Sequence, residues 1–381
     1  MTLRSSWPFS FIAGLLLFGA VPGLAQGAPP VPPAVSAADR AAILDDLLQA
    51  LEETYVFPET AEKMTEFVRR QEKSGAYDAL SNLEDFTEKV TEDLRSVSHD
   101  LHLRVRWSPP EPPEVAGQEP SPEEEARRFA AFVRRDNACF RKVELLTGNV
   151  GYVKLDCFMP ASFGGATAVA AMGFLAGADA LIFDLRDNGG GSPSMIQLLT
   201  SYLVTGDPAR GEETIHLNSF YIRNGDRTDQ YWTQAWVPGT RMTEVPVFVL
   251  TSGETFSAAE EFTYNLKSLK RGTIVGETTG GGAHPVNRHT VEGYPVVMSL
   301  PFGRAINPIT HTNWEGTGVT PDVAVPAADA LREAHGRALG AIADKATDPE
   351  IQHGARFARR IVEGRGRVVA LSAAEQNAFV G

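Results

Sequence analysis

The sequence predicts an α/β fold in which a smaller helical domain precedes a larger core of alternating strands and helices. Three observations support this prediction. Residues 37–97 repeat apolar side chains at helical spacing, and residues 149–325 alternate short apolar runs with helical segments. Some of these runs, such as residues 247–250, lack the polar alternation of a half-exposed strand, which is typical of a sheet covered on both faces.

Length and charge exclude some classes of protein. At 381 residues, the chain can bury one large core and a smaller domain. The net charge of −13 argues against nucleic acid or an anionic membrane surface as the main partner, because neither attracts an acidic protein. No lysine- or arginine-rich run changes this balance.

Residues 1–25 are typical of a secretory signal peptide. Arg4 precedes an apolar run, and small residues then suit cleavage near Ala25. A membrane anchor is the alternative, but the run is too short for a full span and no second hydrophobic segment follows. We therefore expect a periplasmic or extracellular protein with no stable membrane span. Residues 26–36 are rich in proline and alanine and predict an extended linker.

Residues 37–107 predict an N-terminal helical domain that ends in a strand. Helical periodicity covers residues 38–55, 60–75 and 83–97. The period then changes to two over residues 101–107, so that His102 falls on the polar face, opposite the apolar face. That apolar face consists of Leu101, Leu103, Val105 and Trp107.

The rest of the chain divides into a connection, a core and a tail. Residues 108–136 are rich in proline and glutamate and predict an exposed connection. Residues 137–326 form the predicted core, and residues 327–381 a helical tail. Within the core we expect strands at 150–158, 180–186, 245–251, 272–278 and 294–303, with helices at 194–204 and 257–270.

The two cysteines, Cys139 and Cys157, flank a predicted β-hairpin. If the turn is centred on Gly148, the two cysteines lie opposite each other on one face. A two-residue Gly148-Asn149 loop shifts the register by one, and the cysteines then face opposite sides. The sequence leaves open whether they form a disulfide or are two separately buried thiols.

Three glycines, 189–191, follow an apolar strand that ends in Asp184-Leu185-Arg186-Asp187. Glycine permits positive φ angles and allows a ligand to approach backbone N–H groups. A turn between strand and helix is the structural alternative. A dinucleotide motif would need a glycine at Ser194, and no phosphate-binding Gly-Lys-Ser/Thr follows. The functional interpretation is therefore an anion or oxyanion cradle.

Ser257 lies where an apolar strand meets a helix. The run Ser-Ala-Ala-Glu, ending at Glu260, is a capping box, in which serine and glutamate satisfy backbone donors. The same position suits a nucleophile, because the free N–H groups and dipole of a helix start favour an oxyanion.

A serine nucleophile needs a base. His102 is the first candidate, and His284 and His311 compete with it; Glu315, Glu277 or Asp100 could orient the base. As a metal site, His99 and His102 lack an evident third ligand, so we expect no metal.

Five blocks of sequence, in order and spacing, resemble the C-terminal processing (tail-specific) serine peptidases. The similarity is closest to the branch with bacterial relatives of interphotoreceptor retinoid-binding protein and the tricorn protease core. It runs from about Asp39 to Pro326. The blocks are GYVKLDCF, LIFDLRDNGGG, VFVLTSGETFSAAEEFTYNLK, IVGETTGGGAHP and WEGTGVTPDVAV.

This resemblance implies a ClpP/crotonase-like α/β core behind the helical domain, with Ser257 as nucleophile. It also implies an oxyanion hole made by the N–H of Ala258 with that of Gly190 or Gly191. Such donors stabilise a tetrahedral oxyanion.

The chain departs from the family pattern in two respects. The block after the serine helix has no lysine, so the tricorn-like variant fits, with His102 as base and Glu315 as acidic partner. Ser98 or His99 could support them, and His284 remains a competing base. Only residues 108–138 separate the histidine region from the core, too few for a PDZ domain, so we expect none.

The resulting hypothesis is a secreted serine endopeptidase with a Ser-His-Glu site, a peptide or protein substrate and no cofactor. The alternative is a carrier of retinoid- or fatty-acid-like ligands on the same scaffold, which would not need Ser257, His102, Glu315 and the glycine run together. A crotonase-type acyl-CoA enzyme is a third hypothesis that rests on fold alone. The sequence does not determine oligomeric state or cleavage specificity.

Overall fold

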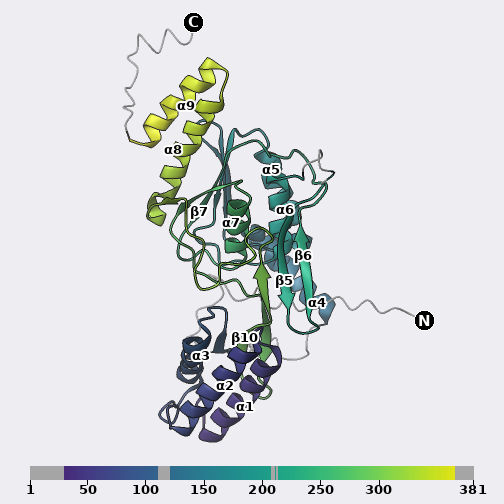
Figure 1. Ribbon diagram of the computed structural model, residues 1–381, viewed down its shortest axis with the longest axis vertical. Coiled ribbons are helices and arrows are strands. Elements are labelled where there is room, and N and C mark those ends of the chain that lie inside the picture. The colour runs from purple at the N-terminus through teal and green to yellow at the C-terminus, as the bar shows by residue number, and fades with distance from the viewer. Residues whose placement is uncertain (1–29, 110–120, 207–210, 212, 365–381) are drawn as a thin grey trace, which may run out of the picture.

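The computed structural model describes residues 30–109, 121–206, 211 and 213–364, and shows the predicted mixed α/β architecture (Figure 1). The predicted signal peptide at 1–25 lies outside these residues, as do part of the linker, residues 110–120 and the end of the tail. None of the helices in the described ranges is both long and apolar enough to cross a membrane.

The core is a six-stranded sheet with the order β12-β8-β7-β4-β3-β2. β2 pairs antiparallel with β3, and every other neighbouring pair is parallel. Each new parallel strand is added on the same side of the previous one, so right-handed crossovers bring the connecting helices onto one face. The strands are β2 (Phe140–Leu146), β3 (Val150–Leu155), β4 (Ala180–Asp184), β7 (Val247–Thr251), β8 (Thr273–Gly276) and β12 (Val323–Ala324).

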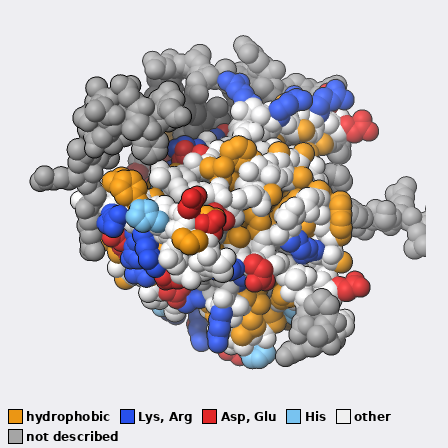
Figure 2. All heavy atoms as spheres, turned by 90° about the horizontal axis from the view of Figure 1, so that it is seen from above, with side chains coloured by type: hydrophobic (Ala, Val, Ile, Leu, Met, Phe, Trp, Pro, Cys, Tyr) orange, Lys and Arg blue, Asp and Glu red, His pale blue; other side chains and the backbone are white. Residues whose placement is uncertain are grey.

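Helices cover both faces of this sheet, as the unbroken apolar strands predicted. Leu181 and Phe183 of β4 pack in one cluster with α5 (Ala161–Phe174), α6 (Pro193–Leu203) and α7 (Ala258–Ser268). Ile182, between them, packs in a second cluster with residues of α8 (Ala327–Lys345) and α9 (Pro349–Val362). In Figure 1 the α8–α9 pair is the yellow hairpin at one end of the molecule. Figure 2 looks onto that end, where hydrophobic side chains alternate with charged ones.

The N-terminal domain combines α1 (Ala37–Thr54), α2 (Pro58–Lys73) and α3 (Leu83–Ser98) with an antiparallel sheet, β1-β10-β9. Only β1 (Arg104–Trp107) belongs to this part of the sequence; β9 (Val286–Thr290) and β10 (Val296–Pro301) lie between β8 and β12 of the core sheet. Leu103 and Val105 are buried with Met298 and Leu300 against the helices. Figure 1 shows β10 extending from the helices α1–α3 toward the core.

The predicted strand over 101–107 is shorter than expected. His99 ends α3 in the left-handed conformation, at φ 56°, and a turn over Leu101 and His102 precedes β1. Leu101 is therefore 40% exposed, although the alternation placed it on the apolar face. The helix end and the turn override the strand pattern at these residues.

A third sheet and two helices, α5 and the helix over residues 122–135, were not expected. The sheet β11-β5-β6 consists of β5 (His216–Ile222), β6 (Arg227–Trp232) and β11 (Gly303–Ile306). The prediction of a loop over 108–136 is wrong for α4 (Pro122–Arg135), which begins with a capping box from Ser121 to Glu124. Phe129 and Val133 on this helix are buried in the core. Pro122 and the glutamates Glu123, Glu124 and Glu125 lie in the first turn of this helix, where both residue types are favourable.

Cys139 and Cys157 form a disulfide. Leu146 pairs with Val150, which centres the hairpin turn on Gly148, as in the first of the two predicted registers. The register shifts at a bulge between Phe140 and Lys142, and the disulfide lies just beyond it. The bond joins the turn after α4 to the segment that follows β3.

Replacing both cysteines by serine should lower the free energy of unfolding by about 3 kcal/mol. A disulfide restricts the unfolded chain, and the entropy lost by closing a loop of about 15 residues corresponds to this value. The bond spans 18 residues. Urea unfolding of the wild type and the double variant, each with and without reductant, measures this. Reductant should destabilise only the wild type; equal stability of all four samples would contradict the prediction.

Candidate active site

Ser257 lies at the turn between β7 and α7, as predicted, but its backbone is not that of an ordinary helix cap. Its φ and ψ are 55° and −120°, whereas a cap residue normally adopts the extended region. A positive φ at a serine is strained and is typical of functional turns. Such a turn resembles the strand-to-helix elbow that presents a nucleophile in hydrolases.

Glu260 holds this turn in place. Its buried carboxylate accepts the Ser257 N–H at 2.8 Å, so this half of the predicted capping box is well formed. The Ser257 hydroxyl faces the first helical turn, but no hydrogen bond to it meets normal geometry, so the other half of the box is loose. The half-buried hydroxyl therefore remains available for other partners.

The same carboxylate fixes the loop after β8. It also accepts hydrogen bonds from the hydroxyl of Thr279 and from the N–H groups of Gly281 and Gly282, at 2.5, 2.7 and 2.8 Å. Burial raises the pKa of Glu260, although these four donors oppose the shift. One carboxylate thus joins the Ser257 turn to the loop that carries His284.

The glycine run lies beside Ser257. A Cβ on Gly190 would approach Ser257 Cβ to 2.7 Å and the Ala258 nitrogen to 2.9 Å. The second distance is that of a hydrogen bond, so the missing side chain leaves room for an acceptor beside the Ala258 N–H. Gly190 has φ 110° and Gly191 has φ 139°, values that favour glycine.

His102 lies against the residue before Ser257. Its ring centroid is 4.6 Å from that of Phe256, and a Cβ on Gly282 would lie 2.6 Å from its Cε1. Its Nδ1 is shielded from solvent and has no hydrogen-bond partner among the described residues. Burial lowers the pKa of His102 to about 4, and the nearby Asp100 carboxylate only partly opposes this.

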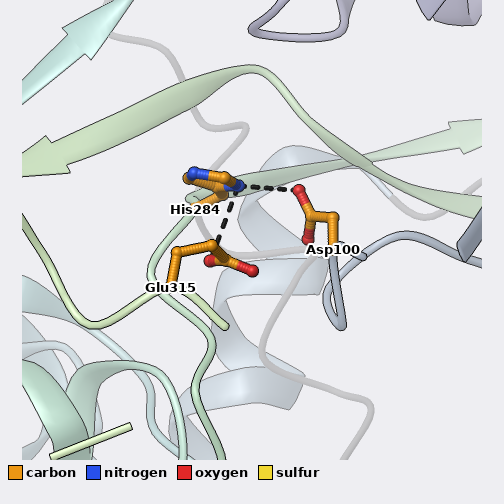
Figure 3. Close-up of side chains that lie close together, drawn as sticks. All are labelled: Asp100, His284 and Glu315. Atoms are coloured by element: carbon orange, nitrogen blue, oxygen red, sulfur yellow. Dashed lines mark hydrogen bonds and ion pairs between the residues drawn. The ribbon is translucent and has the colours of Figure 1, made fainter. Parts of the chain in front are cut away.

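Two buried side chains, Asp100 and His284, and the half-buried Glu315 form a trio close to His102 (Figure 3). His284 Nδ1 is 2.7 Å from Asp100 Oδ2 and 3.5 Å from Glu315 Oε2. Asp100 Oδ1 also accepts the backbone N–H of His102 at 3.0 Å, and Tyr55 donates its hydroxyl to Oδ2. Glu315 therefore lies against His284, and it makes no hydrogen bond or ion pair with His102 in the described part of the chain. The two histidines are linked through Asp100.

The surroundings of the two histidines shift their pKa values in opposite directions. Burial alone would lower the pKa of His284, but the hydrogen bond to Asp100 and the charges of Asp100 and Glu315 outweigh it, and the pKa is raised. Burial, together with the Asp100 charge, raises the pKa of Glu315 to about 7. At neutral pH His102 is thus neutral and able to accept a proton, whereas the pKa of His284 is shifted in the opposite direction, which favours the charged ring more than in a free histidine.

Asp100, His284 and Glu315 are also the residues that could hold a metal, since their donor atoms lie within 4.8 Å of one another. One imidazole and two carboxylates suit Zn²⁺ or Mn²⁺. Hydrogen bonds already engage Asp100 Oδ2 through Tyr55 and His284, and Glu315 Oε2 through the N–H of Ala283. Glu315 Oε1 is shielded from solvent and has no hydrogen-bond partner among the described residues.

The other candidate residues lie outside this cluster. His99 and His311 are exposed, and Ser98 accepts the N–H of Asp100 at 3.2 Å. Glu277 is exposed and accepts the N–H of Ala327.

Sequence reasoning did not identify Tyr55 or the buried Asn188 as parts of the site. No local pattern points to Tyr55. Asn188 directly precedes three glycines, and an asparagine in that position is a recognisable signal of a turn.

A serine on a strained strand-to-helix turn next to a glycine run, with a neutral imidazole packed against the preceding residue Phe256, suits a serine hydrolase. The comparisons narrow this class. The family model for peptidase family S41 matches residues 149–325, and the model for the N-terminal domain of this family in eukaryotic IRBP matches residues 37–143. The chain belongs to peptidase family S41 and is a serine-type peptidase, as the motif resemblance predicted. Only residues 144–148 separate the two matches, which leaves no room there for a PDZ domain.

Solved structures agree with this fold. A putative peptidase from Parabacteroides merdae superposes with a TM-score of 0.53 at 20% identity, over 82% of this chain and 100% of that one. A lipoprotein from Streptococcus agalactiae gives 0.51 at 17% identity, over 83% and 99%. The photosystem II D1 C-terminal processing protease is also similar, at 16% identity over 76% and 93%, with a TM-score of 0.46.

The pKa of His102 should lie below the ordinary histidine value of about 6.5, and the pKa of His284 should lie above it. In an NMR titration, His102 should stay neutral until about pH 4, whereas His284 should keep its proton above the ordinary value. The unfolded chain binds a proton at His102 near pH 6.5 and the folded chain only near 4, so this residue lowers stability as the pH falls through that window. His102→Gln and His284→Gln assign the signals. A His102 midpoint near 6.5 would contradict the burial argument.

Proposed function

We propose that this protein is a secreted serine endopeptidase in which Ser257 attacks the peptide carbonyl and His102 acts as the base. The observation that carries the proposal is the strained backbone of Ser257, at φ 55° and ψ −120°, together with the neutral ring of His102, which packs against Phe256, the residue before Ser257. A helix cap needs neither feature. Peptides or proteins are the substrate class that family S41 implies.

In the proposed reaction, His102 takes the hydroxyl proton of Ser257 as the serine oxygen bonds to the carbonyl carbon. The tetrahedral oxyanion then collapses, the carbon–nitrogen bond breaks, and the imidazolium returns the proton to the leaving amine. Water, deprotonated by the same imidazole, hydrolyses the acyl-enzyme and regenerates Ser257. The lowered pKa of His102 keeps it in the basic form at neutral pH.

The proposed oxyanion hole is formed by the backbone of Ala258 and the glycine run. The N–H of Ala258 has no hydrogen-bond partner among the described residues, and a space beside it faces Gly190. Donors fixed before the reaction stabilise the developing charge without reorganisation.

Glu315 acts on His102 indirectly in this proposal. Its carboxylate lies 3.5 Å from His284, His284 bonds Asp100, and Asp100 bonds the backbone N–H of His102. Glu315 is therefore a positioning residue that keeps Asp100 and His284 in place. The same contacts raise the pKa of His284, so His102 is the better candidate for the base.

The carrier alternative is less well supported. A surface pocket of about 460 Å³ lies at the carboxyl ends of β4, β7 and β8, and its lining includes Arg186, Asp187, Glu254 and Glu277. Such a charged lining does not suit a retinoid or a fatty-acid chain, since apolar ligands need apolar pockets.

A fluorophosphonate probe should label the wild type and fail to label Ser257→Ala, because only a serine nucleophile is phosphonylated. His102→Ala should slow labelling by about 100-fold or more, in the range of general-base catalysis. Mass spectrometry of the labelled peptide identifies the modified residue. Ser252→Ala is the matched control. Ser252 lies in the same β7–α7 loop as Ser257, is buried, and donates its hydroxyl to the carbonyl of Arg186, so removing its hydroxyl should not remove the label.

Equal labelling of wild type and Ser257→Ala, or no labelling of folded wild type, would refute the catalytic proposal. If His284→Ala abolishes labelling and His102→Ala does not, the base is His284.

Export is supported by the N-terminal sequence and by the disulfide, which is typical of an oxidising compartment. The full chain, expressed in a secreting bacterial host, should be recovered outside the cytoplasm without residues 1–25. N-terminal sequencing of the recovered protein tests this. An intact N-terminus on cytoplasmic, reduced protein would overturn the proposal of export.

A further inference from the structure

We infer that Asn188 is a positioning residue for the oxyanion hole, and that Gly191 rather than Gly190 supplies its second N–H. This inference deepens the proposed function and rests on it. It selects one of two donors that the sequence left open, and it assigns a role to a buried side chain that touches no reacting atom.

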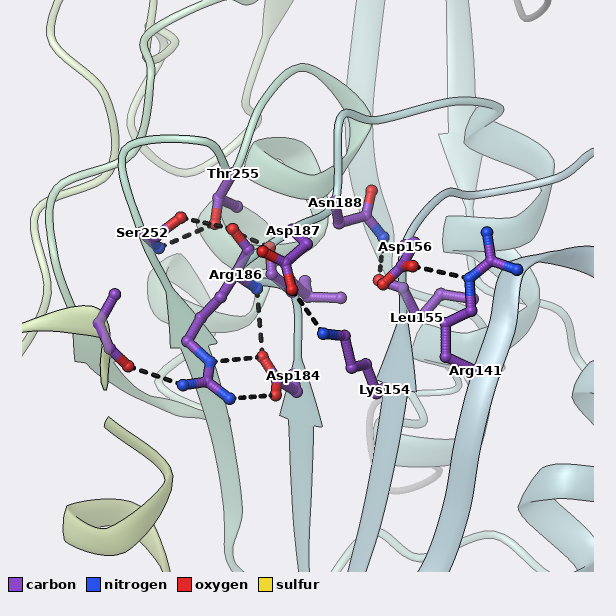
Figure 4. A network of polar contacts seen from close by, with 12 residues as sticks. Arg141, Lys154, Leu155, Asp156, Asp184, Arg186, Asp187, Asn188, Ser252 and Thr255 are labelled. Carbon is purple, nitrogen blue, oxygen red and sulfur yellow. Dashed lines mark hydrogen bonds and ion pairs between the residues drawn. The ribbon is translucent and has the colours of Figure 1, made fainter. Parts of the chain in front are cut away.

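Asn188 is completely buried and joins three segments around the site. Its Nδ2 donates to the carbonyl of Leu155, at the end of β3, at 2.7 Å (Figure 4). Its Oδ1 accepts the N–H of Gly190 at 2.9 Å. Its own carbonyl accepts the N–H of Phe256, next to Ser257, at 3.0 Å. One residue therefore fixes the glycine run relative to both the sheet and the Ser257 turn.

The bond to Asn188 removes Gly190 from the candidate donors. The N–H of Gly190 is already engaged by Oδ1, and the side chain that accepts it is held by Leu155. An oxyanion would have to break this buried hydrogen bond to use the Gly190 N–H. Such a loss is costly where no water can replace the partner.

Gly191 has the geometry of the donor. The carbonyl of Gly190 accepts the N–H of Phe158, and the N–H of Ser192 donates to the Phe158 carbonyl, both at 2.7 Å. In a parallel bridge the N–H and carbonyl of the residue between two such bonds point away from the partner strand. Phe158 extends β3, and β4 lies between β3 and β7, so the Gly191 N–H points to the side of β7 and Ser257.

The N–H of Gly191 has no hydrogen-bond partner in the described ranges, so it is free to donate to an oxyanion. A Cβ on Gly191 would lie 2.2 Å from the Phe158 carbonyl oxygen, so only glycine permits this close approach. The Asn188 contacts and the Phe158 bridge thus fix the glycine run from two sides and direct the Gly191 N–H, with that of Ala258, toward Ser257.

The test measures catalysis by folded protein in Asn188→Ala and Asn188→Ser. Alanine removes both side-chain bonds, whereas a serine hydroxyl can still accept the N–H two residues on, more weakly. With p-nitrophenyl acetate, kcat and the rate of fluorophosphonate labelling should fall about 10- to 100-fold in Asn188→Ala, as for a displaced oxyanion donor. The KM should change little, and Asn188→Ser should lie between alanine and wild type.

Asn307→Ala is the matched control. Asn307 is also buried, its Nδ2 contacts the carbonyl of Leu217, and its Oδ1 accepts the N–H of Ile309. It should lower the melting temperature as Asn188→Ala does, yet leave kcat per folded molecule near that of wild type. If Asn188→Ala does not fold, Asn188→Ser and Asn307→Ser provide the same comparison.

NMR of ¹⁵N-glycine-labelled protein tests the choice of donor. On phosphonylation of Ser257, the Gly191 amide proton should move downfield and the Gly190 amide should not. A shift at Gly190 instead would overturn the assignment, as would equal kcat losses in the Asn188 and Asn307 variants. Wild type that is not labelled at all refutes the proposed function itself, whereas labelled wild type with fully active Asn188→Ala refutes only this inference.

Discussion

The pairing of β1 with β10 is the constraint on which the site depends. Asp100 and His284 are 184 residues apart in sequence, yet their side chains lie 2.7 Å apart. They meet because one precedes β1 and the other precedes β9 and β10, and the register Val105 to Met298 brings the two segments together. The helices α1–α3 bury the same strands, so the N-terminal domain completes the site instead of forming a separate unit.

Glu260 is the second such constraint, and it gives the Ser-Ala-Ala-Glu pattern a wider meaning. An ordinary capping glutamate is exposed and bonds one N–H, whereas this one is buried and accepts four donors. A buried carboxylate is costly unless it is hydrogen-bonded, and these donors offset that cost. They also offset the strain at Ser257, because Glu260 ties the turn to both α7 and the loop after β8 that contains Gly281 and Gly282.

The sequence predicted features that depend on local pattern and missed those that depend on distant pairing. The strand-to-helix turn at Ser257, the glycine run and the hairpin centred on Gly148 each follow from neighbouring residues. The strands β5, β6 and β11 lack a distinctive alternation and owe their pairing to one another. Asp100 was one of three candidates to orient the base, but its contact with His284 could not be read from residues so far apart.

Two histidines within one cluster acquire different properties from their surroundings alone. His102 has its Nδ1 buried without a partner, so burial favours the neutral ring. His284 lies between two carboxylates, so the charged ring is favoured. Environments that separate the pKa values of similar groups are how enzymes assign acid and base roles. Asp100 contacts both histidines, but it raises the pKa of His284 through a hydrogen bond to the ring, whereas at His102 it bonds only the backbone and its charge does not outweigh burial.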